Sequence, residues 1–200
     1  RTERPKPPFT TSTMQQDAGS RLGWGAQITM RVAQRLYENG YITYMRTDSI
    51  NLSQQAITAA RNAAKALYGA DHVADAPRVY QGKTKNAQEA HEAIRPAGDT
   101  FKTPGELAPE LSRDEFALYD LIWKRTVASQ MADAKKMQMR VDFDATTNDG
   151  KKTIFRANGS VITFPGFLAA YEDIVTDENK DEESEDKRLP AMTLGQSVKV

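Results

Sequence analysis

The chain has 200 residues, 39% of them hydrophobic and 27% charged, with a formal net charge of zero. This composition is typical of an ordinary soluble protein with one large domain or two small ones, and no stretch approaches the ~18 apolar residues of a membrane helix. The absence of cysteine excludes disulfides, thiolate nucleophiles and cysteine-ligated zinc. No export signal is present, which fits the cytoplasm, and a first residue other than Met predicts an internal segment of a longer protein.

The zero net charge hides an asymmetry between the two halves of the chain. Residues 1–102 hold 14 Lys and Arg against 9 Asp and Glu, whereas residues 103–200 hold 13 against 18. Nine of those acids fall within residues 172–186. If the chain binds DNA, the first half should do so, although exposed loops that simply carry charge explain the pattern equally well.

The first predicted elements are an extended piece and a broken helix. Residues 1–9 are rich in proline and predict a linker or an extended first strand. Residues 14–39 have a helical period, and the glycines on both sides of Trp24 break this segment into two helices or a helix and a turn. Gly40 can end it with a left-handed cap. The apolar stripe of its second part consists of Ile28, Val32, Ala33, Leu36 and Tyr37.

A short extended segment and a second helix follow. YITYMRTDS, residues 41–49, is too short for a helix and rich in aromatic and β-branched residues. Ser53 can cap a helix that runs to Tyr68 and closes at Gly69. The residues expected to face inward are Ile57, Ala60, Ala64 and Leu67.

The middle of the chain predicts two more helical segments. Residues 86–96 favour one or two helical turns stopped by Pro96. Ser112 and Glu115 form a capping box that begins a helix to about Met131. The buried face of this helix is predicted to contain Phe116, Tyr119, Ile122, Trp123 and Val127.

The last third predicts strands. Apolar and polar residues alternate over 137–144, and the segment 148–150 has the sequence of a hairpin turn. A second strand at 152–157, a turn at Asn158-Gly159 and a third strand at 160–164 complete the expected meander. The predicted fold class is therefore α+β: a linker at 1–9, a helical unit at 10–131 and a β-rich part at 132–200, with an acidic loop at 172–187.

The segment YITYMRTDS carries the candidate chemistry. In an extended conformation, Tyr44, Arg46 and Asp48 project to one face, and Thr43 and Met45 to the other. A phenol with a pKa of about 10 is a poor nucleophile at neutral pH, but Arg46 could stabilise its charge or hold a phosphate through two hydrogen bonds. Packing is the commoner role of a tyrosine in a short apolar segment, so the residues alone supply only a candidate nucleophile.

Four segments together resemble one enzyme family. GYITYMRTDS followed by NLS resembles the active-site signature of the type IA DNA topoisomerases, in particular of their bacterial topoisomerase I branch rather than topoisomerase III or reverse gyrase. PFTTSTMQQ at 8–16, QEAHEAIRP at 88–96 and LIWKRTVASQM at 121–131 also resemble segments of that family, in matching order. Residues 132–200 match more loosely, as strands of the arch (hinge) domain that closes the family's DNA-sized hole.

The resemblance implies a mechanism. The motif's second tyrosine, Tyr44, would attack one DNA strand and stay joined to its 5′-phosphate while the other strand passes through the gap. The 3′-hydroxyl would then reseal the break, so negative supercoils would relax without ATP. Arg46 matches the arginine that contacts the scissile region, and Thr43 and Asp48 belong to the signature and are expected to shape its backbone near DNA, with Asp48 orienting Arg46.

Other residues have two interpretations each. His91 matches a histidine near the family's active site that contacts DNA; as an alternative it is a surface histidine that caps a turn. Arg95 is a DNA-binding candidate, or it pairs with Glu92 or Asp99. His72 lies in a predicted loop and is expected to have no role. The segment Thr10 to Gln16 could line single-stranded DNA, but helix capping explains it equally well.

The family's cofactor is Mg²⁺, held by acids of a TOPRIM domain, and the sequence supplies no such cluster. Asp142 and Asp144 alternate with apolar residues and are interpreted as the solvent face of a strand. We therefore expect no metal ligand in this chain, and no DNA relaxation by this segment alone. Its expected partners are the single-stranded region of supercoiled DNA and the TOPRIM and C-terminal domains of the same protein, as a monomer in the nucleoid.

Two further classes of function remain open at this stage. One is a non-catalytic module that binds or clamps single-stranded DNA and keeps the signature without cutting. The other is a tyrosine recombinase or type IB enzyme, which joins to the 3′-phosphate and needs several dispersed Arg and His residues. The context TYMRTDS does not resemble the second class.

Overall fold

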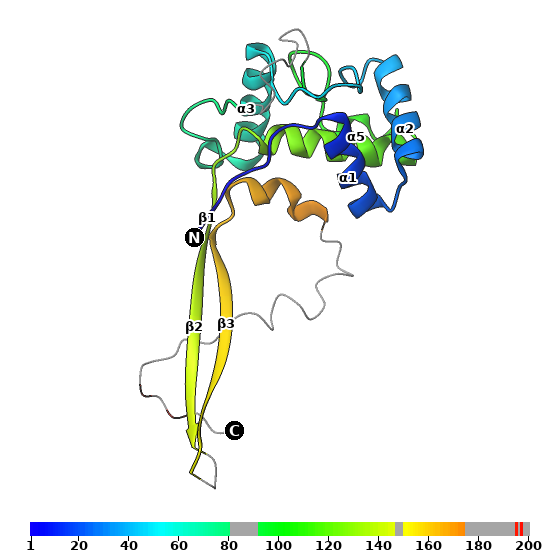
Figure 1. Cartoon of the computed structure of the whole chain (residues 1–200). Helices are drawn as coiled ribbons and strands as arrows, with labels where there is room; N and C mark the ends of the chain where they lie inside the picture. The colour runs from blue at the N-terminus through cyan, green and yellow to red at the C-terminus, as the bar shows by residue number, and fades with distance from the viewer. Residues whose placement is uncertain (81–91, 147–149, 175–194, 196, 198–200) are drawn as a thin grey trace.

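A unit of helices and a long antiparallel ribbon make up the chain (Figure 1). The computed structural model describes residues 1–80, 92–146, 150–174, 195 and 197. The helical unit contains α1 (Thr11–Leu22), α2 (Ala26–Glu38), α3 (Gln54–Tyr68), the 3-10 helix η1 (Ala70–His72), α4 (Pro104–Leu107) and α5 (Arg113–Ala128). A further 3-10 helix, η2 (Gly166–Ile174), returns from the ribbon to pack beside α5.

Local sequence signals fix where most of these helices begin and end. Thr10, Ser53 and Ser112 each accept a hydrogen bond from a backbone N–H in the first turn of the helix that follows. The predicted capping box of Ser112 and Glu115 is confirmed. The predicted break near Trp24 is also confirmed, because Gly23 adopts a left-handed conformation (φ 70°) and ends α1.

The apolar stripe of α2 was predicted correctly at Val32, Ala33 and Leu36 and wrongly at Ile28 and Tyr37. The buried residues are Thr29, Val32, Ala33 and Leu36, whose spacing follows one face of a helix. Ile28 and Tyr37 flank this face and are each 42% exposed. Leu67 of α3 is likewise 52% exposed, contrary to expectation, because Tyr68 lies four residues after Ala64 and packs against the core in its place.

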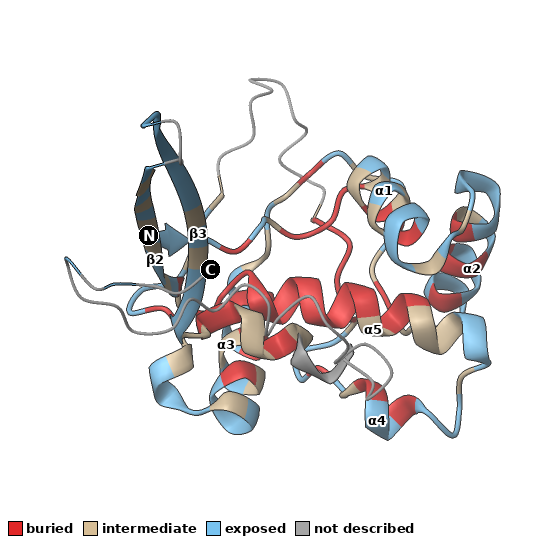
Figure 2. Cartoon of the chain, turned by 90° about the horizontal axis from the view of Figure 1, so that it is seen from below, coloured by how far each residue is buried: buried red, intermediate tan, exposed pale blue. Residues whose placement is uncertain are grey.

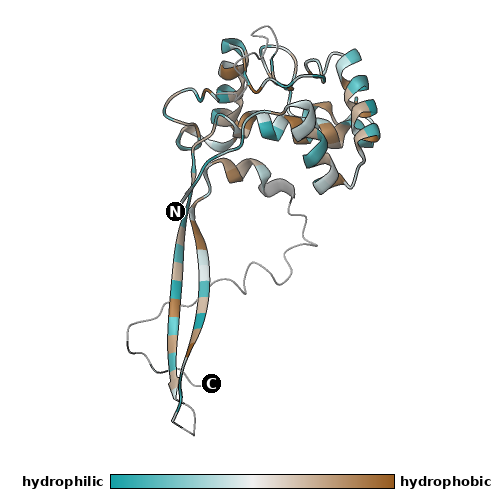
Figure 3. Ribbon diagram, viewed as in Figure 1, coloured by the Kyte–Doolittle hydropathy of each residue, from teal (hydrophilic) through white to brown (hydrophobic). Residues whose placement is uncertain are grey.

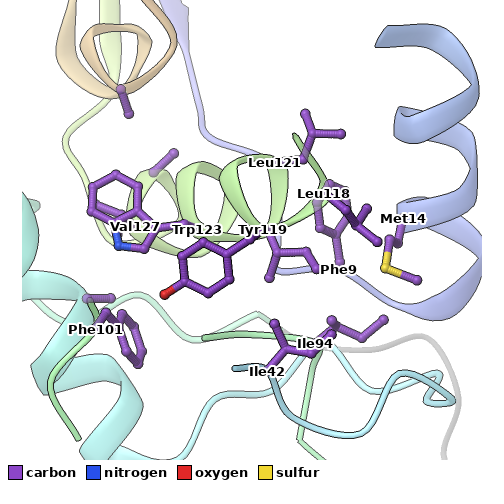
Figure 4. Packing of buried hydrophobic residues seen from close by; sticks show 14 of the residues in the cluster. Phe9, Met14, Ile42, Ile94, Phe101, Leu118, Tyr119, Leu121, Trp123 and Val127 are labelled. Atoms are coloured by element: carbon purple, nitrogen blue, oxygen red, sulfur yellow. The ribbon is translucent and has the colours of Figure 1, made fainter. Parts of the chain in front are cut away.

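The centre of the unit is α5, which is more buried than predicted. One buried face was expected, but residues 121–131 are buried on all sides because α1, α2, α3, α4 and η2 surround the helix (Figure 2). The helix ends at Ala128, and the chain stays buried through Met131. Its own Tyr119 and Trp123 are part of the same core as large side chains from distant segments: Phe9, Met14, Ile42, Ile94 and Phe101 (Figure 4).

The helical turns predicted before Pro96 are absent where the structure describes the chain. Residues 92–96 are extended, with Ile94 bridged to Phe9 and Pro96 bridged to Ile42. Pairing with segments far away in sequence therefore overrides the local helical preference. The remainder of the predicted turns, 86–91, lies outside the described residues.

The strands form one long hairpin rather than a meander. β2 (Ala134–Thr146) pairs antiparallel with β3 (Lys152–Phe164) over their whole length, and β1 (Thr2–Glu3) pairs with the base of β2. The turn predicted at Asn158-Gly159 is wrong: these residues lie opposite Arg140 and Met139 inside the ladder, because β2 is long enough to pair with both halves of β3. The chain reverses between the paired residues Thr146 and Lys152, where the first turn signal predicted; Gly150 there has φ 83°, and Asn148 and Asp149 of the predicted turn lie outside the described residues.

The alternation of apolar and polar residues along the ribbon is visible as bands (Figure 3). Helices packed around α5 and an antiparallel sheet of β1, β2 and β3 confirm the α+β fold class.

The predicted acidic loop lies almost entirely outside the described residues. Among the described helices, none combines the length and apolar character needed to cross a bilayer.

Candidate active site around Tyr44

Three segments that are distant in sequence meet at the signature. The start of α1, the segment 41–51 and the segment 92–97 lie side by side through backbone pairing. Ile94 donates its N–H to the carbonyl of Phe9 (2.9 Å), and Ala97 donates to that of Tyr41 (2.9 Å). The sequence had shown the three segments only as separate matches; the fold assembles them into one surface.

The signature was expected to be extended, but it contains a single bridge residue, Ile42, and bends at Tyr41, Thr43 and Met45; it still exposes its candidate residues. Met45 and Ser49 are buried, whereas Tyr44, Arg46 and Asp48 are exposed. This pattern confirms the predicted alternation over residues 44–49. Arg46 and Asp48, both within the described residues, form no ion pair with each other, so the expected orientation of Arg46 by Asp48 is absent from this structure.

The phenol of Tyr44 is open to solvent. The residue is 44% exposed, and its ring meets the ring of Tyr37 from α2 edge-on, with centroids 5.2 Å apart. Tyr41 differs, because its hydroxyl donates to Glu110 (3.0 Å), and this hydrogen bond raises the pKa of the Tyr41 phenol. An acceptor on the hydroxyl opposes its ionisation, so Tyr44 is the better placed nucleophile of the two.

Thr43 ties the signature to the segment that follows the undescribed residues 81–91. Its N–H donates to the Arg95 carbonyl (2.9 Å), and its hydroxyl donates to the Ala93 carbonyl (2.8 Å). The same hydroxyl accepts from the N–H of Arg95 (3.0 Å). Thr43 therefore shapes the backbone of the signature, which is the structural part of its predicted role.

Arg95 is buried and holds the segment 92–98 together. Its guanidinium binds the carboxylate of Glu92 (2.7 Å) and donates to the carbonyls of Pro96 (2.8 Å) and Gly98 (3.0 Å). Burial of Glu92 raises the pKa of its carboxyl, but hydrogen bonds from Arg95 and Ser53 outweigh burial and lower it overall. The pair with Glu92 was the structural alternative for Arg95, and it is present.

The two histidines are placed differently. His91 lies outside the described residues. His72, in η1, packs its ring against that of Phe164 at the base of β3, with centroids 5.0 Å apart. It therefore contributes to the joint between the helical unit and the ribbon, a packing role that its loop-like sequence gave no signal for.

The fourth segment that resembles the family, residues 121–131, lies largely in α5 and binds the residues around the start of α1. The buried Arg125 donates to the Pro7 carbonyl (2.7 Å), pairs with Asp17 (3.3 Å) and lies over the ring of Phe9 (4.6 Å). Lys124 pairs with Asp120 (2.9 Å) on the same helix. These cations stabilise the fold and are not free to bind DNA.

The described residues contain no group of three His, Asp or Glu side chains that could hold a metal ion. Asp142 of β2 instead accepts two hydrogen bonds from Arg156 of β3 (2.8 and 3.1 Å), which lower the pKa of its carboxyl. The described part of the chain therefore does not fit a Mg²⁺ site.

Comparison with known proteins decides the family. The family model described as DNA topoisomerase matches residues 1–200. The chain belongs to the bacterial type IA DNA topoisomerase family. Two similar topoisomerases are the "DNA topoisomerase 1" of Mycolicibacterium smegmatis, 56% identical over 98% of this chain, and that of Streptomyces coelicolor, 53% identical over 97%.

The topoisomerase likeness extends to solved structures. Full-length topoisomerase I from Thermotoga maritima has a TM-score of 0.68 and 37% identity, and the match covers 86% of this chain and 28% of that one. The chain spans about a fifth of the length of the curated topoisomerases that it matches, 21% for M. smegmatis and 20% for S. coelicolor. The topoisomerase assignment made from four short segments is confirmed.

Proposed function

We propose that this chain is the part of a type IA DNA topoisomerase that carries its nucleophile, Tyr44. Tyr44 attacks a phosphate of one DNA strand and forms a 5′-phosphotyrosine link. The other strand passes through the break, and the free 3′-hydroxyl reseals it, so negative supercoils relax. The phosphotyrosine keeps the energy of the broken link, and resealing needs no ATP.

The observation that carries the proposal is the solvent-open phenol of Tyr44 within the family's signature. Of the three tyrosines nearby, Tyr41 donates its hydroxyl to Glu110, and Tyr37 lies on α2 and presents its ring to Tyr44. Arg46 is exposed two residues further on. Its guanidinium can bind the phosphate and stabilise the charge that develops during transfer.

The DNA contacts are part of the proposal. Single-stranded DNA passes over the exposed side of the signature at Arg46 and Asp48, and Thr43 and Arg95 shape the backbone that lines it. His91 contacts DNA near the scissile phosphate. The buried guanidinium of Arg95 favours an indirect contribution, through the segment 92–98.

We place the Mg²⁺ site in the TOPRIM domain of the full-length protein, because the described residues offer no ligand cluster. The chain of residues 1–200 is then inactive by itself. Incubation of this chain with negatively supercoiled plasmid and magnesium should leave the plasmid supercoiled, and a ladder of topoisomers would contradict the proposal.

The polarity of the covalent link tests the nucleophile. With end-labelled single-stranded DNA on a denaturing gel, the full-length protein should trap the 5′-phosphate and release a free 3′-hydroxyl. Tyr44→Phe should abolish the adduct, and Tyr37→Phe, which keeps the ring that meets Tyr44, should retain it. An adduct that persists in Tyr44→Phe would refute the assignment, and a 3′-linked adduct would favour a recombinase-like enzyme.

A non-catalytic clamp is the second candidate function, supported by the exposed signature and the absence of a described metal cluster. It predicts binding of single-stranded DNA with no adduct in any variant. The same gel therefore separates the two functions.

A further inference from the structure

The backbone on either side of Tyr44 is held by two threonine hydroxyls. Before it, the hydroxyl of Thr43 binds the Ala93 carbonyl (2.8 Å). After it, the hydroxyl of Thr11 from α1 binds the Met45 carbonyl (2.8 Å). Within the described part of the chain, the N–H and C=O of Tyr44 itself form no hydrogen bond. The backbone of this residue is therefore positioned through its two neighbours, in addition to the contact of its ring with Tyr37.

The hydroxyl of Thr11 contacts three backbone groups of Met45 and Thr47, the residues on either side of Arg46. Its hydroxyl oxygen lies 2.8 Å from the Met45 carbonyl oxygen, 2.9 Å from the Thr47 nitrogen and 3.1 Å from the Thr47 oxygen. A hydroxyl has one proton, so it donates to Met45, the shorter contact, and accepts from the N–H of Thr47. The N–H of Thr11 donates to the Thr47 carbonyl (2.9 Å). The backbone of Arg46 is thus fixed at both ends by one residue.

Thr11 is itself rigidly held. It is the first residue of α1 and lies within the capping box formed by Thr10 and Thr13. Phe9, two residues earlier, is fully buried, is bridged to Ile94 and lies beneath the guanidinium of Arg125. The hydroxyl of Thr11 therefore links the exposed signature to the packed core.

Resting on the proposed attack by Tyr44, we propose that Thr11 is a positioning residue for DNA cleavage. Its hydroxyl fixes residues 45–47 so that Arg46 and the phenol of Tyr44 face the same phosphate. Thr11 itself does not contact DNA, because its hydroxyl is occupied by the signature backbone. Displacement of a reacting group by about 1 Å can cost ~10²-fold in rate, so a backbone attachment this close to both side chains affects cleavage more than DNA binding.

Three variants of the full-length protein test this. Thr11→Val keeps the shape and removes the hydroxyl, Thr11→Ser keeps the hydroxyl, and Thr29→Val removes a buried hydroxyl of α2 that donates to the Gly25 carbonyl (3.1 Å). Adduct formation is followed in a single turnover with saturating end-labelled single-stranded oligonucleotide, and oligonucleotide affinity is measured separately.

We expect Thr11→Val to slow adduct formation by about tenfold to a hundredfold while the Kd for the oligonucleotide stays within about twofold. Thr11→Ser should restore the rate to within about threefold of the wild type, and Thr29→Val should cleave at the wild-type rate. Rescue by serine is the outcome that a merely structural role of the methyl group does not produce.

Three results would overturn the inference: Thr11→Val cleaves like the wild type, Thr11→Ser is as slow as Thr11→Val, or the loss in Kd equals the loss in rate. Tyr44→Phe, run in parallel, keeps this separate from the proposed function. If Tyr44→Phe loses the adduct but Thr11→Val forms it at the wild-type rate, only the positioning role fails. If Tyr44→Phe keeps the adduct, the proposed function fails.

Discussion

The helical unit and the ribbon differ in how far they bury their apolar side chains. In the helical unit, side chains from residues 9 to 134 converge on α5 and bury it. In the described part of the ribbon, β2 pairs with β3 along its length and with β1 at its base, and apolar residues of both long strands stay exposed, among them Met137, Phe155 and Ile154 at 63%. Chemistry that needs precisely placed groups therefore belongs to the helical unit, where a core fixes the backbone.

The largest expected difference between the two regions is in stability. Ile122 of α5 is fully buried, and Ile122→Ala should lower the free energy of unfolding by about 2–5 kcal/mol because it leaves a cavity. The same change at Ile154 of β3, Ile154→Ala, should cost within about 0.5 kcal/mol because its side chain is already in water. Urea unfolding of the 200-residue chain measures both, and equal losses would contradict the contrast.

A pair of arginines should sharpen the functional side of the contrast. Arg46→Ala in the full-length protein should slow single-turnover cleavage by about a hundredfold and weaken DNA binding less, because its proposed role is with transition-state charge. Arg140→Ala, an exposed arginine of β2, should leave the cleavage rate unchanged. Equal losses of rate and affinity in Arg46→Ala would count against that role.

The smallest expected effect is on the pH dependence of the unfolding free energy, to which the ion pairs of the two regions contribute differently. Because the pKa of Glu92 is lowered in the folded state, its contribution to stability is present above the unfolded pKa, about 4.3, and is lost as pH falls through the lower folded pKa. Glu92→Gln should therefore flatten the fall in unfolding free energy between about pH 5 and pH 3.

The matched control is Asp142 of the ribbon, whose exposed pair with Arg156 is screened by solvent. Asp142→Asn should change that pH dependence less than Glu92→Gln does. A Glu92→Gln variant with the slope of the wild type would contradict the role of the pair with Arg95.

Local signals predicted well what local physics decides. The capping box at Ser112, the break at Gly23 and the alternation in β2 all appear where the sequence placed them, because caps, left-handed glycines and the pleat need only neighbouring residues. The alternation of Met45 with the exposed Tyr44 and Arg46 followed from the same reasoning.

Long-range pairing decided the rest and could not be predicted. Residues 92–96 have a composition that favours a helix, but they pair with Phe9 and Ile42 instead. The turn signal at Asn158-Gly159 is overridden because both residues pair with β2. The hydroxyl of Thr11 meets the signature more than thirty residues away, with no periodic pattern to signal the contact. For the site, the sequence predicted the candidate residues, and the fold supplied what holds them.

The most direct test of the central claim is the identity of the modified tyrosine. The covalent adduct of the full-length protein with DNA, digested with nuclease and trypsin, should leave a nucleotide on the peptide from Leu36 to Arg46, which contains Tyr37, Tyr41 and Tyr44. Fragmentation of that peptide should place the nucleotide on Tyr44. A nucleotide on Tyr37 or Tyr41, or an unmodified peptide, would contradict the account.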